Sequence, residues 1–271
     1  MPRVLALSSH VAFGSVGLAV MVPALHALGH ETIAVPIVVL SNHPGYGGFA
    51  GERIAPAIIE EMIEALDRNG WLADVDAVLT GYLPTAGHVA SAAGAIARVR
   101  ASNPAALVLC DPVCGDDPGG LYLDQSVPAA IAELLLPAST IATPNRFEAS
   151  WLSGMPITTP KEAVDAARAL NIPTVLVTSV PASGDRLATV LVEQDAACAC
   201  FVPRRESAPR GSGDLLAALY LGHVLNGAGP ESALGRAVAG VEAVIAASGP
   251  NELVLAGAVR AAAEALPATP V

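Results

Sequence analysis

Several short polar clusters in this 271-residue chain have residue types and spacings that could do chemistry. The sharpest is Gly211-Ser212-Gly213-Asp214, which precedes the apolar run LLAALYLGHVL. The first N–H groups of a helix lack internal partners and carry partial positive charge, and glycine lets an anion approach them closely. Asp214 beside such an anion could accept a proton from an attacking hydroxyl. The cluster therefore fits phosphoryl transfer, and the alternative is a plain helix N-cap by Ser212 or Asp214.

A second cluster places Asn145 and Glu148 three residues apart in TPNRFE, after a short apolar run. An amide oxygen and a carboxylate on one helical face can hold Mg²⁺ through its waters, beside nucleotide phosphates. The alternative is a capping box, with Asn145 as N-cap and Glu148 reaching back to it. Asp111 and Asp116 in CDPVCGDD suit the same metal or phosphate site, unless this is only a solvated loop.

Further polar residues follow the first strands that the sequence predicts. Ser9 comes after the strand expected at Val4–Leu7, and His43 comes after the strand expected at Ile33–Leu40. Tyr82 follows a third strand and could stack on an aromatic ring. These positions indicate a site for a small polar ligand. The string GYGGFA at 45–50 matches a dinucleotide-binding pattern only weakly, since it follows the second strand and contains Tyr46.

Strands that alternate with helices must position these residues. Apolar runs predict strands at 4–7, 33–40, 76–80, 107–111, 141–143 and 173–178, and an antiparallel pair within 187–202. Helical spacing predicts helices at 17–28, 54–68, 86–101, 127–136, 160–170, 213–226, 230–248 and 253–265. Repeated strand-then-helix units indicate an α/β fold, a mostly parallel sheet with helices on both faces, and one domain over residues 1–271. Ligands bind such sheets beyond the carboxyl ends of the strands, which is where the polar clusters lie.

Composition excludes several other classes of protein. The net charge of −11 argues against partners with phosphate backbones or anionic lipid. Despite a mean hydropathy of +0.53, no apolar run reaches the ~20 residues of a membrane span, and the N-terminus lacks a signal-peptide pattern. The only lysine, Lys161, follows a proline, so the chain has no Walker A loop, and a Schiff-base role is disfavoured. The four cysteines have no zinc-ligand spacing and fit a reducing cytosol. The chain also has no G-x-S-x-G motif, so nothing supports nucleophilic hydrolysis.

These fragments occur together in one order, and in that order the chain resembles the pyridoxal kinases of the ribokinase-like superfamily. The resemblance runs through nearly the whole length and rests on SSHVAFGSVG, LSNHPGYG, GYL, CDPVCGD, TPNRFE, LVTS and GSGD. It implies a three-layer α/β/α sandwich that transfers the γ-phosphoryl of ATP to the 5′-hydroxyl of pyridoxal, and often of pyridoxine or pyridoxamine. It also implies Mg²⁺, with a monovalent cation as a further candidate, a homodimer and a cytoplasmic location.

The resemblance assigns roles residue by residue. Asp214 matches the catalytic base, and Gly211, Ser212 and Gly213 match the anion hole. Asn145 and Glu148 match the motif that organises magnesium, with Asp111 as a third metal candidate. The remaining matches are Asp111, Asp116, Tyr122, Thr143, Thr178 and Ser179 at the ATP site, and Ser9, His43 and Tyr82, with the adjacent Pro44 and Gly45, around the pyridine ring.

Two physical expectations accompany these roles. Because lysine is absent from the motifs, Arg210, or else Arg204 or Arg205, should reach over the phosphates. A helix N-terminus should lower the pKa of Asp214, so that the carboxyl is ionised at neutral pH.

The chain departs from the family pattern at the substrate side. Pro44 stands where the family commonly has a threonine, which leaves the preference among B6 vitamers open, and Ser212 replaces a threonine. The segment CFVPRRESAPR before the GSGD motif also differs. Hydroxymethylpyrimidine or another small alcohol is therefore an alternative substrate. A non-catalytic protein that binds pyridoxal phosphate or nucleotide is a third reading, against which the intact Asp214 argues.

Overall fold

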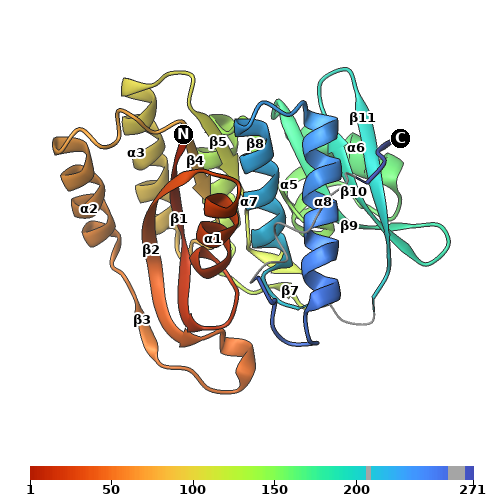
Figure 1. The fold of residues 1–271 in the computed structure, drawn as a ribbon, viewed down its shortest axis with the longest axis horizontal. Coiled ribbons are helices and arrows are strands. Elements are labelled where there is room, and N and C mark those ends of the chain that lie inside the picture. Colours follow the sequence, from red (N-terminus) through yellow and green to blue (C-terminus); the bar gives the residue numbers. More distant parts are fainter. Residues whose placement is uncertain (206–208, 256–265) are drawn as a thin grey trace.

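The computed structural model describes residues 1–205, 209–255 and 266–271. In these ranges ten strands form one sheet in the order β12-β11-β10-β9-β8-β5-β4-β1-β2-β3 (Figure 1). The pairs from β2 through β1, β4, β5 and β8 to β9 are parallel, and the strands at both edges are antiparallel. The strands are β1 (Arg3–Phe13), β2 (Glu31–Asn42), β3 (Gly51–Arg53), β4 (Ala77–Thr80), β5 (Leu107–Cys110), β8 (Ile141–Ala142), β9 (Thr174–Ala182), β10 (Arg186–Val192), β11 (Ala197–Pro203) and β12 (Thr269–Pro270), and a separate hairpin pairs β6 (Gly115–Asp116) with β7 (Gly120–Leu121).

Helices cover both faces of the sheet, which confirms the predicted three layers. One face carries α1 (Leu18–Ala27), α7 (Ser212–Leu225) and α8 (Pro230–Ala247), which lie in front of the sheet in Figure 1. The other face carries α2 (Pro56–Arg68), α3 (Ala86–Ser102), α4 (Ser126–Ala130), α5 (Arg146–Ser153) and α6 (Pro160–Ala169). Within the described ranges, no helix has the length and hydrophobicity of a membrane span.

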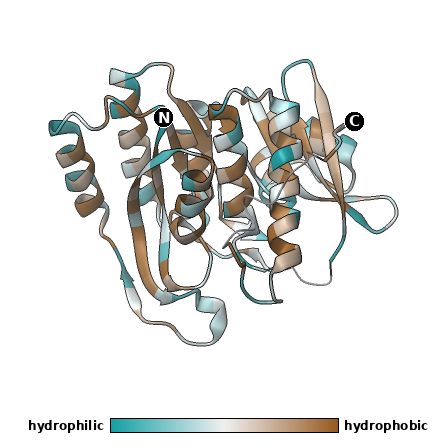
Figure 2. Ribbon diagram, viewed as in Figure 1, coloured by the Kyte–Doolittle hydropathy of each residue, from teal (hydrophilic) through white to brown (hydrophobic). Residues whose placement is uncertain are grey.

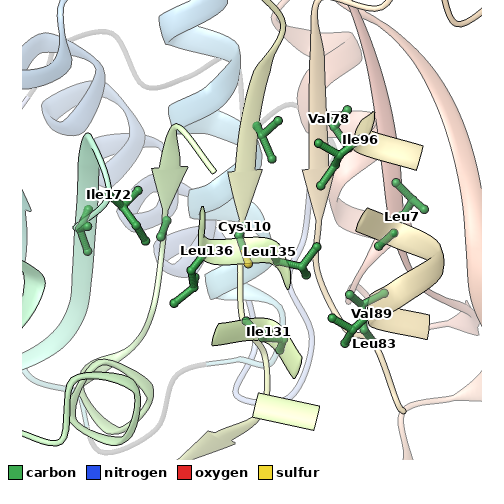
Figure 3. Close-up of a cluster of buried hydrophobic side chains, with 14 of the residues drawn as sticks. Leu7, Val78, Leu83, Val89, Ile96, Cys110, Ile131, Leu135, Leu136 and Ile172 are labelled. Carbon is green, nitrogen blue, oxygen red and sulfur yellow. The ribbon is translucent and has the colours of Figure 1, made fainter. Parts of the chain in front are cut away.

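The buried strands are apolar on both sides because each face of the sheet is covered. Successive residues point to opposite faces, so Val108 and Cys110 pack under α3 and its neighbours, while Leu109 packs under the layer of α7. Figure 3 shows the first of these layers, where Cys110 and Leu7 of the sheet face Ile96 and Ile131. Figure 2 shows the hydrophobic colour both on strands of the sheet and on helices packed against it, such as α7.

Some boundaries differ from the sequence prediction. The first strand does not end at Leu7, because β1 continues alongside β2 as far as the Phe13–Asn42 pair, with a register shift between Ser8 and Ser9. Ser9 therefore lies in a strand and not in a loop, a fact that the polar sequence concealed. The helix expected at 127–136 is α4 followed by a π-helical turn (Ile131–Leu135) and a 3₁₀ turn (Leu136–Ala138).

The C-terminal helix expected at 253–265 is only partly covered by the structure. Residues 253–255 are not helical, and residues 256–265 lie outside the described ranges. The short edge strands β3 and β12 have too few apolar residues to be read from the sequence.

Candidate active site

The N-terminus of α7 lies at the edge of the sheet where the central parallel strands end. Its N-cap is Gly211, which has a left-handed φ of 89°. A Cβ at this position would lie 1.9 Å from the carbonyl oxygen of Ser15, so only glycine fits. No side chain of the described residues caps this helix, which contradicts the plain N-cap reading by Ser212 or Asp214. The first N–H groups of α7 are thus left for an anion.

Asp214, in the first turn of α7, is held by the turn between β1 and α1. Its Oδ2 accepts a hydrogen bond of 2.9 Å from the backbone N–H of Gly17. Burial raises the pKa of Asp214 to about 6, and the Gly17 N–H opposes this rise. The prediction that the helix terminus would lower this pKa is wrong, because the loss of water outweighs the favourable dipole. A carboxyl with a pKa near 6 is still mostly ionised at neutral pH.

Asp111 follows β5 and is 7% exposed. Burial raises its pKa well above the usual range, and the negative charges of Glu148 and Asp214 raise it further. The negative charges of carboxyls from two other segments therefore act on Asp111. Thr143 follows β8, the strand that pairs with β5. Its Oγ1 is buried and has no hydrogen-bond partner among the described residues.

Asn145 and Glu148 form the capping box of α5. Asn145 Oδ1 accepts from the N–H of Glu148 at 3.0 Å, and Glu148 Oε2 accepts from the N–H of Asn145 at 2.9 Å. The same two side chains also form hydrogen bonds with the loop after β5. Glu148 Oε1 accepts from the N–H of Cys114 at 2.8 Å, and Asn145 Nδ2 donates to the carbonyl of Gly115 at 2.8 Å. The alternative reading of this motif, a capping box, is what the structure shows.

The expected magnesium ligands Asp111, Asn145 and Glu148 stay a prediction beside this geometry. Each polar end of Asn145 makes one hydrogen bond to a backbone group, and these two bonds orient its side chain. The described residues contain no group of three or more His, Cys, Asp or Glu side chains that could hold a metal ion. Burial raises the pKa of Glu148 to about 7 against the lowering effect of its backbone N–H donors. Asp111 and Glu148 are thus buried carboxylates whose negative charge a nearby cation would relieve.

The other residues expected at the ATP site are only partly brought together. Thr178 in β9 pairs with Asn145 as an isolated parallel bridge, so it borders the capping box. Ser179 beside it has a φ of 59°, in the left-handed region. Asp116 and Tyr122 lie at the β6–β7 hairpin, and Tyr122 is 52% exposed.

Arg210 directly precedes Gly211, the N-cap of α7, and its side chain lies against the turn after β2. Its guanidinium carbon is 5.4 Å from the centroid of the Tyr46 ring. A Cβ on Gly45 would come within 2.7 Å of Arg210 Nη2, so the guanidinium occupies the space of a missing side chain. His43 Nδ1 accepts from the N–H of Gly45 at 3.0 Å, and burial together with the charge of Arg210 lowers the pKa of His43. Pro44 lies between them in the short 3₁₀ turn Pro44–Tyr46.

Of the other two arginines considered for the phosphates, Arg205 forms an ion pair of 2.7 Å with Glu242 on α8, and Arg204 is exposed. Neither arginine is placed with the carboxylates around Asp214 by any contact among the described residues.

Ser9 and Tyr82 border the same region as Asp214. Gly17 has a φ of 56° and packs so closely on β1 that a Cβ would lie 2.2 Å from the carbonyl oxygen of Ser9 and 2.4 Å from its Oγ. Tyr82 follows β4, and its N–H donates to Oγ of the buried Ser8 at 3.2 Å. Burial raises the pKa of Tyr82.

Two residues of this region were not singled out from the sequence. Gly17 holds Asp214, and the paired glycines of FGSVG are the signal that could have indicated a tight turn there. Glu252 contacts two turns of the site, and nothing in the surrounding sequence SGPNELV distinguishes it.

Comparisons with known proteins agree with this fold. The family model described as phosphomethylpyrimidine kinase matches residues 22–256. A pyridoxal kinase PdxY from Deinococcus radiodurans is 37% identical over 247 residues, which cover 86% of this chain and 83% of that protein. One from Rubrobacter xylanophilus is 36% identical over 279 residues, which cover 99% of this chain and 95% of that protein. The chain belongs to the pyridoxal kinase family. A pyridoxal kinase from Leishmania donovani, solved with ADP and pyridoxamine, matches with a TM-score of 0.94 at 29% identity, over 100% of both chains. The resemblance seen in the sequence and the ribokinase-like fold are thereby confirmed, and the chain is a kinase.

Proposed function

We propose that this member of the pyridoxal kinase family transfers the γ-phosphoryl of ATP to the 5′-hydroxyl of pyridoxal, with pyridoxine and pyridoxamine as further acceptors. The observation that carries the proposal is the position of Asp214 at the uncapped N-terminus of α7. One carboxylate oxygen is held by Gly17, and Oδ1 accepts no hydrogen bond from the described residues. That oxygen can orient a primary hydroxyl and accept its proton late in a loose transition state.

The backbone at Gly211, Ser212 and Gly213 supports the anion-hole role. The N–H groups at the start of α7 are unsatisfied donors that would stabilise charge on the transferring phosphoryl group. These N–H groups are held in place before the reaction, because Gly211 packs closely against the carbonyl of Ser15.

Magnesium fits the carboxylates that surround this point. Asp111 and Glu148 have raised pKa values because they are buried near other negative charges, and a divalent cation would relieve that repulsion. These two residues would hold the ion, and Asn145 would orient Glu148. When bound with ATP, Mg²⁺ neutralises charge on the phosphates. Thr143, Thr178, Ser179, Asp116 and Tyr122 would line the nucleotide site.

The pyridine ring of the acceptor would lie between the strand ends of β1, β2 and β4. Ser9, His43 and Tyr82 are the proposed ring contacts. Pro44 has no side-chain hydrogen-bond donor in the turn after β2. The Arg210 guanidinium packs on Gly45 of this turn and would serve as the donor to the acceptor molecule instead.

One experiment tests the reaction and the base together. Purified protein is incubated with MgATP, with and without KCl, and separately with pyridoxal, pyridoxine, pyridoxamine and hydroxymethylpyrimidine, beside the Asp214→Ala variant. Phosphorylated pyridoxal that is lost in the variant supports the proposal. Phosphorylation of hydroxymethylpyrimidine alone would keep the mechanism and move the substrate, an alternative that the description of the matching family model keeps open. Absence of any product would favour a binding role.

A cytoplasmic homodimer is part of the proposal. The four cysteines are all free, as expected in a reducing compartment. Light scattering on the purified protein measures the oligomeric state.

A further inference from the structure

Glu252 connects two turns that border Asp214 but come from distant parts of the sequence. Its Oε2 accepts from the backbone N–H of Ser15 at 3.1 Å, and its Oε1 accepts from the hydroxyl of Tyr46. The backbone on either side adds to this connection. The carbonyl of Asn251 accepts from the Tyr46 hydroxyl at 3.1 Å, and the carbonyl of Leu253 accepts from Ser15 Oγ at 3.0 Å. Figure 1 shows the loop after β2 and the segment after α8 at the same end of the molecule.

Each of these two turns leads to a part of the proposed active site. Ser15 belongs to the turn that holds Asp214, because Gly17 of that turn donates to the Asp214 carboxylate and the Ser15 carbonyl packs on Gly211. Tyr46 belongs to the turn of His43 and Gly45, and Arg210 packs over its ring. The first turn therefore positions the base, and the second borders the proposed acceptor site.

The hydrogen bonds that the Glu252 carboxylate accepts are of a strong type. A carboxylate that accepts from an N–H and an O–H makes charge-assisted bonds, which are roughly twice as strong as neutral ones. Residues 251–255 form neither helix nor strand, so these side-chain and backbone contacts determine where the segment lies. The ring of Phe13, at the end of β1, packs edge-on against Tyr46 at a centroid distance of 6.3 Å and adds an apolar contact on the same side.

We infer that Glu252 is a positioning residue that sets the spacing between the acceptor-side turn at 43–46 and the turn at 14–17 that holds Asp214. The inference rests on the proposed function, since its kinetic effect is expressed in pyridoxal phosphorylation. Loss of the carboxylate leaves the base in place but lets the acceptor-side turn move away from it.

The kinetic test compares five variants with the wild type. Glu252→Ala should raise KM for pyridoxal and lower kcat, with kcat/KM reduced about 10- to 100-fold, because a small misplacement of the acceptor weakens the reaction strongly. The KM for ATP should stay within about twofold of the wild-type value. Glu252→Gln keeps an acceptor for Ser15 and should recover most of the loss. Tyr46→Phe should give a smaller loss, and adding it to Glu252→Ala should cost less than it does in the wild type. The two changes share the Tyr46–Glu252 contact, and only the contact of Tyr46 with the Asn251 carbonyl then remains to be lost. Glu61→Ala, an exposed glutamate on α2, is the matched control and should be neutral.

A second measurement needs no substrate. The segment 43–50 leads into β3, which ends at the exposed Arg53, so Glu252→Ala should speed tryptic cleavage after Arg53 while Glu61→Ala should not. Unchanged cleavage, wild-type kinetics in Glu252→Ala, or an equal rise of both KM values would overturn the inference. A wild-type protein that does not phosphorylate pyridoxal, combined with faster cleavage in Glu252→Ala, would overturn the proposed function and leave the coupling of the two turns intact.

Discussion

The backbone N–H of Gly17 donates a 2.9 Å hydrogen bond to Oδ2 of Asp214, 197 positions further along the chain. This bond favours the ionised carboxylate, while burial favours the protonated acid. The pKa of Asp214 is raised to about 6, so burial has a larger effect on this pKa than the hydrogen bond. A proton acceptor with a pKa just below neutrality combines ionisation at pH 7 with useful basicity.

Removal of the Asp214 carboxylate should abolish most turnover. Asp214→Ala and Asp214→Asn should each lower kcat by roughly 10²–10⁴, because both remove the proton acceptor. Binding of ATP should change little, since the backbone donors of α7 remain. Steady-state kinetics and calorimetric titration with a non-hydrolysable ATP analogue measure the two effects. Near-native turnover in either variant would remove Asp214 from the role of base.

The pH dependence of pyridoxal phosphorylation should reflect the raised pKa of Asp214. Activity needs the ionised form, so kcat/KM should fall about tenfold per pH unit below about pH 6. An ordinary carboxyl would retain activity to near pH 4. Glu148, whose pKa is raised to about 7, and Asp111, whose pKa is raised well above its usual range, are the other buried carboxyls of the site. An acid limb that persists in both Glu148→Gln and Asp111→Asn belongs to Asp214, and one that disappears in either variant belongs to the carboxyl replaced there.

Glu148 should affect stability and magnesium use together. Glu148→Ala leaves the buried N–H groups of Cys114 and Gly115 without their acceptor and should destabilise the fold by at least about 2 kcal/mol. It should also raise the magnesium concentration needed for half-maximal rate. Glu162→Ala is the matched control, because Glu162 closes an exposed capping box in α6. That control should cost about 1 kcal/mol or less and leave the magnesium titration unchanged. An unchanged titration in Glu148→Ala would contradict the metal role.

A side chain at Gly17 should disturb the base without touching it. In Gly17→Ala the new Cβ would meet the Ser9 carbonyl oxygen at 2.2 Å, so the turn must shift and its N–H must leave Asp214. We expect lower kcat and a lower melting temperature. Gly29→Ala is the control, since Gly29 also has a positive φ, of 88°, but has nothing within 4 Å of the new Cβ. It should show only the backbone strain of about 1–2 kcal/mol and keep its kcat. Equal kinetics in the two variants would show that the Gly17 contact is dispensable.

Arg210 should act on the acceptor side of the reaction. Because its guanidinium packs on Gly45 and over Tyr46, Arg210→Ala should raise KM for pyridoxal more than KM for ATP. Arg204→Ala, an exposed arginine nearby in sequence, is the control. A larger rise in KM for ATP would return Arg210 to the phosphate site that the sequence first suggested.

The sequence by itself determined the fold class and the family, and it indicated Asp214 as the candidate base. Unalternating apolar strands separated by helical spacing can only be buried on both faces, so they specify a parallel sheet with helices on each side. The motif GSGD carries its own local chemistry, because glycines at the start of an apolar helix expose backbone donors wherever the helix lies. The clusters after β5 and β8 could be assigned to one edge of the sheet, because the carboxyl ends of parallel strands meet at the same edge.

Only the tertiary structure decided how those groups are used. The pKa of Asp214 depends on burial and on Gly17, which is close in space and remote in sequence. The polar groups of Asn145 and Glu148 are taken up by the loop after β5, and that loop reaches them only in the folded chain. Arg210 turns towards Gly45 because a missing side chain leaves room there. Local residue types specify which chemistry is available, whereas long-range packing sets solvent access and hydrogen-bond partners, and these determine protonation, orientation and the connection that Glu252 makes between two turns.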